Sequence, residues 1–457
     1  MIRLSSINRQ ILKLAVPAIF NNITVPLLGL SDTAITGHLG SDVYLAAMAV
    51  GATIFNVIFM LCGFLRMGTT GLAARANGAS DHLMARNVLS KALSISLLIS
   101  VIVLLFRKYI SSLLISLIGA TPVISAAAAE YFGIVVWSVP AQLAVMAISG
   151  WFIGRQNTMT PMIVSVGVNV VNILASVTLV FGVGLGFKGV AFGTLTANWI
   201  GLFAMLVFLQ LEKKKIENII QRDRKSKEVT SVQNGKAETE KSKIKWTTFF
   251  KVNTNLFFRS ACIMGVSLAM TAYGAKIGEV TLAANSVMLQ FFLFFSYFMD
   301  GFAFAGEALV GNTSGAHDLK GLKKTVANLI KWGCFLSAFF AIVYLTAGND
   351  IVALLSDSEN VRQEIKTMHV WLVVLPVVTV WAFIFDGVFI GLARTGPLLV
   401  VTLIGALFFF GVAELGLNFS EYAKNSILWL AFEIYLLLRG VLLALEYLIL
   451  QRKSLIL

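Results

Sequence analysis

Long apolar segments separated by short polar stretches make up most of this chain. A helix that crosses a lipid bilayer needs roughly 20 apolar residues, and segments of that length recur from one end of the sequence to the other. On this rule we expect twelve transmembrane helices, over residues 10–36, 44–73, 90–112, 124–152, 160–183, 187–210, 250–275, 281–310, 326–347, 362–391, 395–416 and 425–449. The pattern therefore predicts an all-α membrane protein.

One hydrophilic stretch interrupts this pattern near the middle of the chain. Residues 212–245 contain eleven Lys or Arg and six Asp or Glu, with few large apolar side chains. Such a composition is typical of a mobile linker. We therefore expect an N-terminal six-helix lobe over 1–211, a basic cytoplasmic linker over 212–249 and a C-terminal six-helix lobe over 250–457.

Short motifs in the first predicted lobe recur in the second at a constant distance. Leu45-Ala46-Ala47 returns as Leu282-Ala283-Ala284, and Phe152-Ile153-Gly154 returns as Phe389-Ile390-Gly391, each 237 residues later. Gly78-Ala79 with Asp81 likewise returns as Gly315-Ala316 with Asp318. Each copy holds six helices, an even number, so we expect two pseudo-symmetric bundles with the same orientation in the membrane.

Composition and charge support this membrane assignment. Hydrophobic residues make up 58% of the 457, charged residues 13%, and the mean hydropathy is +0.84. The net charge of +13 comes from basic residues gathered in short connections, which favours orientation by positive loops over a nucleic-acid partner. We expect a monomeric, multi-pass protein of the plasma (inner) membrane, in contact with lipid and with both termini cytoplasmic. The basic residues that depart from this loop pattern are Lys108, Lys188, Lys276, Arg362 and Lys424.

A single acid, Asp32, lies inside the first apolar segment. A charged carboxyl away from water costs several kcal/mol, so an acid at this depth is a candidate functional group by default. It stands at the edge of a polar, small-residue helix face formed by Asn22, Pro26, Gly29, Thr33 and Thr36. The alternative is that Asp32 lies at the membrane boundary and only solvates the end of the helix.

Further polar groups fall on two other predicted spans. Ser165, Asn169, Asn172 and Ser176 form a stripe on the fifth span, which fits either a site or hydrogen bonding between helices. On the eighth span Asp300 and Glu307 are two turns apart, and Arg259 of the seventh span is a possible ion-pair partner for Asp300. Asp386 on the tenth span is more typical of a structural residue. These four residues are the second-lobe candidates.

Enzyme chemistry finds little support in the sequence. The four histidines lie at or near predicted loops without metal-ligand spacing, and no glycine-rich phosphate loop follows a strand. The three cysteines read as small apolar residues. We therefore expect no metal, no cofactor and no catalytic residue. Without a nucleotide site, energy must come from an ion gradient.

Several segments resemble the multidrug and toxic compound extrusion (MATE) family, in its DinF-type subgroup. They are AVPAIFNNITVP with the following LLGLSDTAITGHLG, FLRMGTTGLAARANGA, LAANSVMLQFFLFFSYFMDGFAFAGEALVG and VWAFIFDGVFIGLARTG. The resemblance extends over about 15–395. It implies twelve helices in two lobes around a cleft, and export of organic, often cationic or lipophilic compounds in exchange for protons or sodium.

The resemblance also assigns roles to individual residues. Asp32 is similar to the subgroup's first-helix acid, which is associated with proton coupling, and Asn172 and Thr194 match members of the same hydrogen-bonding network. Where the family commonly has an aspartate four residues after that asparagine, this chain has Ser176, and a frequent first-helix tyrosine is Leu28. Asp32 therefore lacks its usual acidic neighbour, which weakens a two-carboxylate or sodium scheme.

These observations predict a secondary active efflux antiporter that exchanges small organic compounds for protons, with Asp32 as the proton carrier. A sodium-coupled drug exporter remains an alternative. A flippase for lipid-linked precursors, from the same wider superfamily, is a second one. Such a flippase should line its cavity with arginines, and the predicted helices offer few, chiefly Arg66, Arg259 and Arg439.

Overall fold

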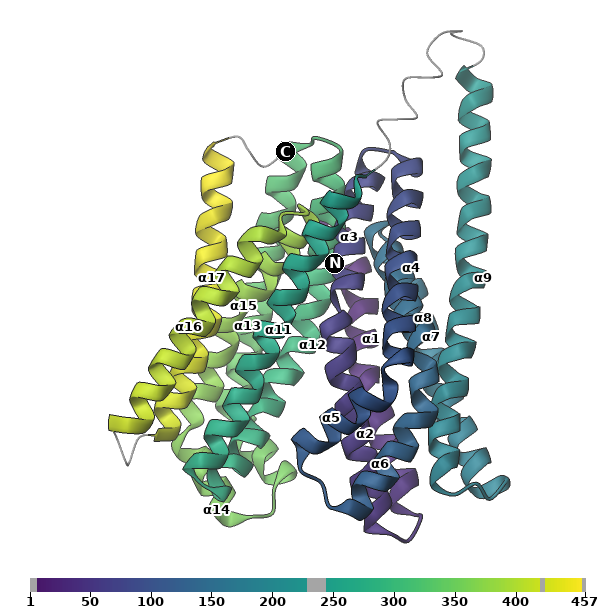
Figure 1. The fold of residues 1–457 in the computed structure, drawn as a ribbon. Coiled ribbons are helices and arrows are strands. Elements are labelled where there is room, and N and C mark those ends of the chain that lie inside the picture. Colours follow the sequence, from purple (N-terminus) through teal and green to yellow (C-terminus); the bar gives the residue numbers. More distant parts are fainter. Residues whose placement is uncertain (1–5, 228–243, 420–423, 454–457) are drawn as a thin grey trace. The chain divides into compact units, whose positions relative to one another are not determined.

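The computed structural model describes residues 6–227, 244–419 and 424–453, and every regular element in these ranges is helical (Figure 1). The helices up to the middle of the chain are α1 (Ser6–Gly37), α2 (Asp42–Cys62), α3 (Phe64–Gly78), α4 (His82–Leu105), α5 (Arg107–Ile118), α6 (Pro122–Val135), α7 (Val139–Gly154), α8 (Met159–Val177) and α9 (Phe187–Lys227). The later helices are α11 (Trp246–Ile277), α12 (Glu279–Gly315), α13 (Leu319–Leu355), α14 (Glu359–Thr367), α15 (His369–Gly391), α16 (Thr395–Phe419) and α17 (Lys424–Arg452). Within the described residues these helices form 12 candidate membrane spans, so the predicted all-α fold with twelve spans is confirmed.

Contacts divide the chain into two compact units. The first lobe comprises Phe20–Phe250, and the second comprises Lys251–Leu457 together with the chain up to Ile19. The predicted boundaries placed all of α1 in the first lobe. The start of α1 groups with the second lobe because its backbone packs closely against α12 at Gly301. A Cβ added at Gly301 would lie 2.8 Å from the carbonyl oxygen of Ala15.

Two predicted spans include residues of a neighbouring helix that lies outside the candidate membrane span. The expected helix over 90–112 is divided at Phe106 between α4 and α5. The expected helix over 362–391 is also divided, because α14 ends at Thr367 and α15 begins at His369. The sequence of α14, ENVRQEIKT, is too polar to belong to an apolar span.

The predicted linker is helical over its first part. Helix α9 continues to Lys227, past the expected boundary at 211, and residues 228–243 of the linker lie outside the described residues. Lys, Glu, Gln and Arg have high helix propensities, and no Gly or Pro interrupts residues 212–227. Charge alone therefore did not mark the end of this helix.

Backbone caps follow the repeat that the sequence motifs predicted. The carboxylate of Asp81 accepts a hydrogen bond from the amide of Met84 at the start of α4, at 2.8 Å. The carboxylate of Asp318 accepts from the amide of Gly321 at the start of α13, at 2.9 Å. Each cap follows a residue with positive φ, Ser80 at 54° and His317 at 54°. The motif spacing of 237 residues therefore corresponds to a repeated local structure.

Close helix packing follows the same repeat. In the first lobe α3 and α7 meet where Gly154 faces the carbonyl oxygen of Thr70, and an added Cβ would lie 2.6 Å from that oxygen. In the second lobe α12 and α15 meet where Gly391 faces the carbonyl oxygen of Glu307, at 2.8 Å for the same added atom. Both contacts need glycine, since real Cβ atoms stay beyond 3.0 Å.

Candidate functional site

Asp32 lies on α1 within the first lobe and is 9% exposed. Its Oδ1 atom is inaccessible to solvent and has no hydrogen-bond partner among the described residues. The hydroxyl of Thr36 donates to the Asp32 carbonyl oxygen at 2.7 Å and approaches the sulfur of Met48 at 3.1 Å, which fixes the backbone beside the acid. The acid is therefore buried, and the described part of the chain provides no ion-pair partner for it.

Asn172, Ser176 and Thr194 come together as a hydrogen-bonded group between α8 and α9. The hydroxyl of Ser176 donates to Asn172 Oδ1 at 3.1 Å, and Asn172 Nδ2 donates to Thr194 Oγ1 at 3.2 Å. Gly193 of α9 lies directly against Ser176, and a Cβ there would be 2.8 Å from the Ser176 amide nitrogen. The small side chains at 176 and 193 allow the two helices to approach, so three of the predicted network residues are adjacent.

Two further side chains extend this group along α9 and α7. Asn198 Nδ2 donates to the carbonyl oxygen of Thr194 at 2.8 Å, and Gln142 Nε2 donates to Asn198 Oδ1 at 2.9 Å. Neither Gln142 nor Asn198 was among the predicted site residues. Both are amides on apolar helices, which was the available signal in the sequence.

Tyr131 of α6 connects the network with Asp32. Its side chain is hydrogen-bonded with that of Thr194 and is close enough to Asp32 to interact with its charge. The ring packs against Gly51 of α2 and stacks on Phe187, with ring centroids 5.7 Å apart. The sequence analysis missed Tyr131, because a tyrosine in an apolar helix looks like an ordinary packed aromatic residue.

The remaining first-lobe candidates occupy other positions. Asn169 Nδ2 donates to the carbonyl oxygen of Thr24 at 3.0 Å and so ties α8 to α1. Asn22 is half-buried and accepts from Asn21 Nδ2 at 3.4 Å. Thr33 is exposed, and its hydroxyl donates to the Gly29 carbonyl oxygen of its own helix at 2.8 Å. Thr33 thus lies on a different side of α1 from the buried acid.

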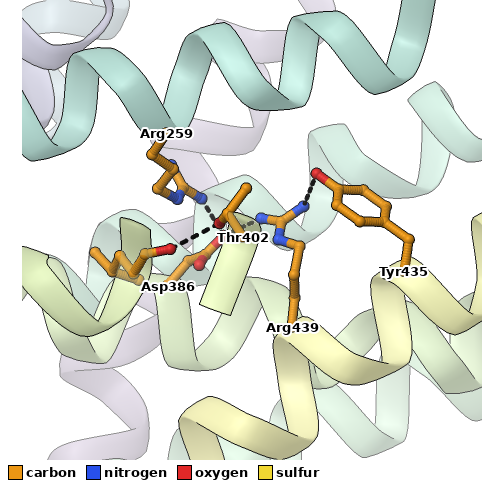
Figure 2. Close-up of polar contacts among 6 residues, drawn as sticks. Arg259, Asp386, Thr402, Tyr435 and Arg439 are labelled. Atoms are coloured by element: carbon orange, nitrogen blue, oxygen red, sulfur yellow. Dashed lines mark hydrogen bonds and ion pairs between the residues drawn. The ribbon is translucent and has the colours of Figure 1, made fainter. Parts of the chain in front are cut away.

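In the second lobe Asp386 lies between two arginines (Figure 2). Its Oδ2 atom pairs with Arg259 of α11 and with Arg439 of α17, the latter at 2.7 Å. Arg439 Nη1 also donates to the hydroxyl of Tyr435 at 3.4 Å. These side chains are nearly inaccessible, at 5% for Arg259, 11% for Asp386 and 9% for Arg439. The two arginines and one aspartate form a buried cluster with a formal charge of plus one.

This cluster adds an ion pair that the sequence analysis did not predict in the second lobe. We expected Asp300 as a possible partner of Arg259, and that pairing stays a prediction. The structure shows a partner of Arg259 that was not predicted, Asp386, 127 residues away. Asp300 is half-buried on α12, close enough to Tyr297 to interact with it electrostatically. Glu307 is 1% exposed at the contact between α12 and α15. The sequence linked neither Asp386 nor Arg439 to Arg259.

Glu433 of α17 is a buried acid that the sequence analysis did not select. It is 4% exposed, and neither carboxylate oxygen has a hydrogen-bond partner among the described residues. One turn earlier on the same helix, Trp429 Nε1 donates to Asn285 Oδ1 at 2.8 Å. An acid within an apolar span was the signal that could have identified it.

Comparisons with known proteins place this arrangement in a family. The family model MatE matches residues 17–178 and 256–413. The DNA damage-inducible protein F of Escherichia coli is 34% identical over 445 residues, which is 96% of this chain and 92% of that protein.

Solved structures show the same fold. The Vibrio cholerae MATE transporter VcmN in its bent form is 19% identical, covers 98% of each chain and superposes with a TM-score of 0.82. A MATE protein in a bent conformation is 18% identical, covers 98% of this chain and 97% of that one, and gives a TM-score of 0.84. With the family model matching both repeats, this chain belongs to the MATE family, whose members are membrane transporters of small organic compounds and not enzymes.

Proposed function

We propose that this protein exports organic, cationic or lipophilic compounds in exchange for protons, and that Asp32 carries the proton. The observation that supports this most directly is the burial of Asp32 in α1 without an ion-pair partner in the described residues. An uncompensated carboxylate is costly away from water, so binding of either a proton or a cation lowers its free energy. Such a group responds to both ions that an antiporter exchanges.

The exchange follows from competition at one carboxyl group. The ionised acid attracts a cationic compound, whereas a proton that arrives from outside neutralises the acid and weakens this attraction. The compound is then released outwards, and loss of the proton to the inside restores the charged acid. Because each ligand changes the affinity for the other by the same factor, binding of the compound must expel a proton.

The network of Asn172, Thr194 and Tyr131 has a supporting role in this proposal. Tyr131 is hydrogen-bonded with Thr194 and close to Asp32. A change of charge on Asp32 therefore alters the electrostatic energy of Tyr131 on α6 and, through their hydrogen bond, affects Thr194 on α9. Asn172 then connects α9 to α8 through Thr194. Helices that share these contacts can respond together when Asp32 gains or loses its proton.

Protons are favoured over sodium because of the ligands available near Asp32. Hard metal cations are bound by several oxygen ligands, usually with carboxylates among them. At 176, where the family commonly has an acid, this chain has a serine whose hydroxyl already donates to Asn172. A single carboxyl group suffices for a proton.

Transport into inverted membrane vesicles tests the coupling ion. We expect a pH gradient alone to drive uptake of a fluorescent organic cation, and a sodium gradient alone to have no effect. Asp32→Asn should abolish the pH-driven uptake, while Thr33→Val, which alters an exposed neighbour on α1, should retain it. Uptake that depends on sodium, with no response to pH, would overturn the proposal.

We further propose that the protein acts as a monomer in the plasma membrane with both termini cytoplasmic. Basic residues at one end of the spans, including Arg75, Arg155 and Arg394, support this orientation under the positive-inside rule. A cysteine introduced at Lys213 should then react with an impermeant thiol reagent in inverted vesicles and not in intact cells. The reverse pattern of labelling would contradict this orientation.

A further inference from the structure

A cavity of about 790 Å³ lies in the first lobe between α5 and α6. These two helices pack side by side (Figure 1). None of the residues that line the cavity belongs to the network around Asn172. Its polar lining consists of Arg107, Lys108, Ser111, Ser112, Ser116 and Ser125. The cavity therefore gathers two cations and four hydroxyl groups on two neighbouring helices.

The positive charge of this cavity is not neutralised. No carboxylate lines it, and neither Arg107 nor Lys108 has an acidic partner within ion-pair distance in the described part of the chain. Arg107 lies over the ring of Trp137, 5.2 Å from its centroid, and donates to the Leu104 carbonyl oxygen at 3.3 Å. The acid on the adjoining part of α6, Glu130, is paired with Lys188 at 2.8 Å. The cavity therefore favours an anion.

The hydroxyl groups and the start of α6 suit a phosphate in particular. Ser111, Ser112 and Ser116 follow the two cations on α5, and serine hydroxyls donate to phosphate oxygens. Ala120 and Ser125 of the lining flank the first turn of α6, where Thr121 makes no side-chain cap and no acid is present. Unsatisfied amides at a helix start add a partial positive charge.

The surroundings of the cavity are those of a membrane interface. Helix α4 has 24 residues, so at about 1.5 Å per residue it already spans the hydrocarbon core before α5 begins. Apolar side chains of α5 and α6 are exposed, with Leu117 at 74% and Val123 at 64%. Tyr109 and Trp137 are exposed aromatic residues of the kind that lie at headgroup level.

We propose that this cavity binds a phosphate-bearing anion, the headgroup of an acidic phospholipid. The phosphate is held by Arg107, Lys108 and the α5 serines, while the acyl chains lie along the exposed apolar side chains. In the orientation proposed above, the lipid belongs to the outer leaflet. This site also accounts for Lys108, a basic residue that departs from the loop charge pattern.

Lipid binding to the purified protein in neutral detergent tests this assignment. We expect phosphatidylglycerol to bind more tightly than phosphatidylcholine, as measured by native mass spectrometry. Arg107→Gln with Lys108→Gln should weaken phosphatidylglycerol binding about 30-fold, since each basic contact with an acidic lipid is worth roughly 1 kcal/mol. A matched control, Lys276→Gln with Lys366→Gln, removes two exposed cations outside the cavity and should bind like the parent.

Two further measurements separate lipid from free phosphate and binding from misfolding. Inorganic phosphate should fail to displace phosphatidylglycerol. If it displaces the lipid at similar concentrations, the cavity binds free phosphate and the assignment to a lipid headgroup is wrong. Ser112→Ala with Ser116→Ala leaves both charges in place and should weaken binding by a smaller factor. If the doubly neutralised variant elutes as folded protein and binds phosphatidylglycerol like the parent, the proposal is wrong.

Discussion

Asp32 and Asp386 are both buried acids on membrane-spanning helices, but their immediate neighbours differ. Asp386 shares one oxygen between Arg259 and Arg439, whereas the described residues give Asp32 no cation. A buried carboxylate shared by two arginines from different helices links those helices, and breaking such a pair is strongly destabilising. We therefore propose that Asp386 holds α11, α15 and α17 together, while Asp32 exchanges protons.

The first prediction concerns the buried cluster of the second lobe. Asp386→Asn removes the negative charge that two buried arginines share, and breaking a buried pair in this way costs about 3–5 kcal/mol. The yield of monodisperse protein after detergent extraction should therefore fall. Adding Arg259→Gln to the same chain removes one of the excess charges and should restore part of that yield.

An exposed ion pair provides the control for this experiment. Glu130 and Lys188 are both largely exposed, so Glu130→Gln should leave the yield unchanged. If Asp386→Asn protein accumulates like the parent but fails to transport, Asp386 takes part in the exchange itself and the structural role is excluded.

At the scale of helices, each lobe contains one pair of closely packed helices, α3 with α7 in the first lobe and α12 with α15 in the second. Corresponding glycines make the close contact in each pair. Gly150 of α7 lies against the backbone of Arg66 on α3, and Gly387 of α15 lies against that of Ala303 on α12. In both places an added Cβ would come well inside 3.0 Å of a carbonyl oxygen. Backbone atoms cannot rotate away, so these glycines set the distance between the helices.

The second prediction follows from this repeat. Gly150→Ala and Gly387→Ala should each lower stability, by about 1–3 kcal/mol for overpacking, and to a similar extent in the two lobes. The apparent melting temperature of the detergent-solubilised protein, followed by size-exclusion chromatography after heating, measures this effect.

Glycines with free space beside them serve as matched controls. Gly167 of α8 and Gly265 of α11 have nothing within 4 Å of an added Cβ, so alanine at either position should be neutral or stabilising. A melting temperature for Gly387→Ala equal to that of Gly265→Ala would contradict the packing role of Gly387.

At the scale of the whole molecule, hydropathy and the internal repeat were sufficient to predict twelve spans and two similar six-helix sets. Both signals act along the chain: an apolar run must reach across the bilayer, and a duplicated helix set keeps its spacing. Asp32, Asn172 and Ser176 were selected for the same reason, since a polar group in an apolar run is visible locally, whereas Thr194 was selected from the resemblance to the MATE family. The structure places Ser176 and Thr194 each within hydrogen-bonding distance of Asn172.

The contacts between side chains on helices far apart in the sequence could not be predicted from these local signals. Arg259 and Arg439 meet at Asp386 across 127 and 53 residues, and several acids were available to each arginine along the sequence. Tyr131 was missed because its hydroxyl matters only through Thr194 and Asp32, which lie on other helices. The helical part of the predicted linker was missed because solvated charged residues suit a helix as well as a coil.

The central claim is that a proton and an organic cation compete for Asp32, and proton release on ligand binding measures this competition directly. In weakly buffered detergent solution, saturating the parent protein with the organic cation should release up to about one proton per bound molecule, most of it at pH values where the acid is protonated beforehand. Asp32→Asn should bind the compound without releasing protons, and its affinity should not depend on pH, while Thr33→Val should behave like the parent. If Asp32→Asn releases as many protons as the parent protein, the exchange takes place at another residue and the account is contradicted.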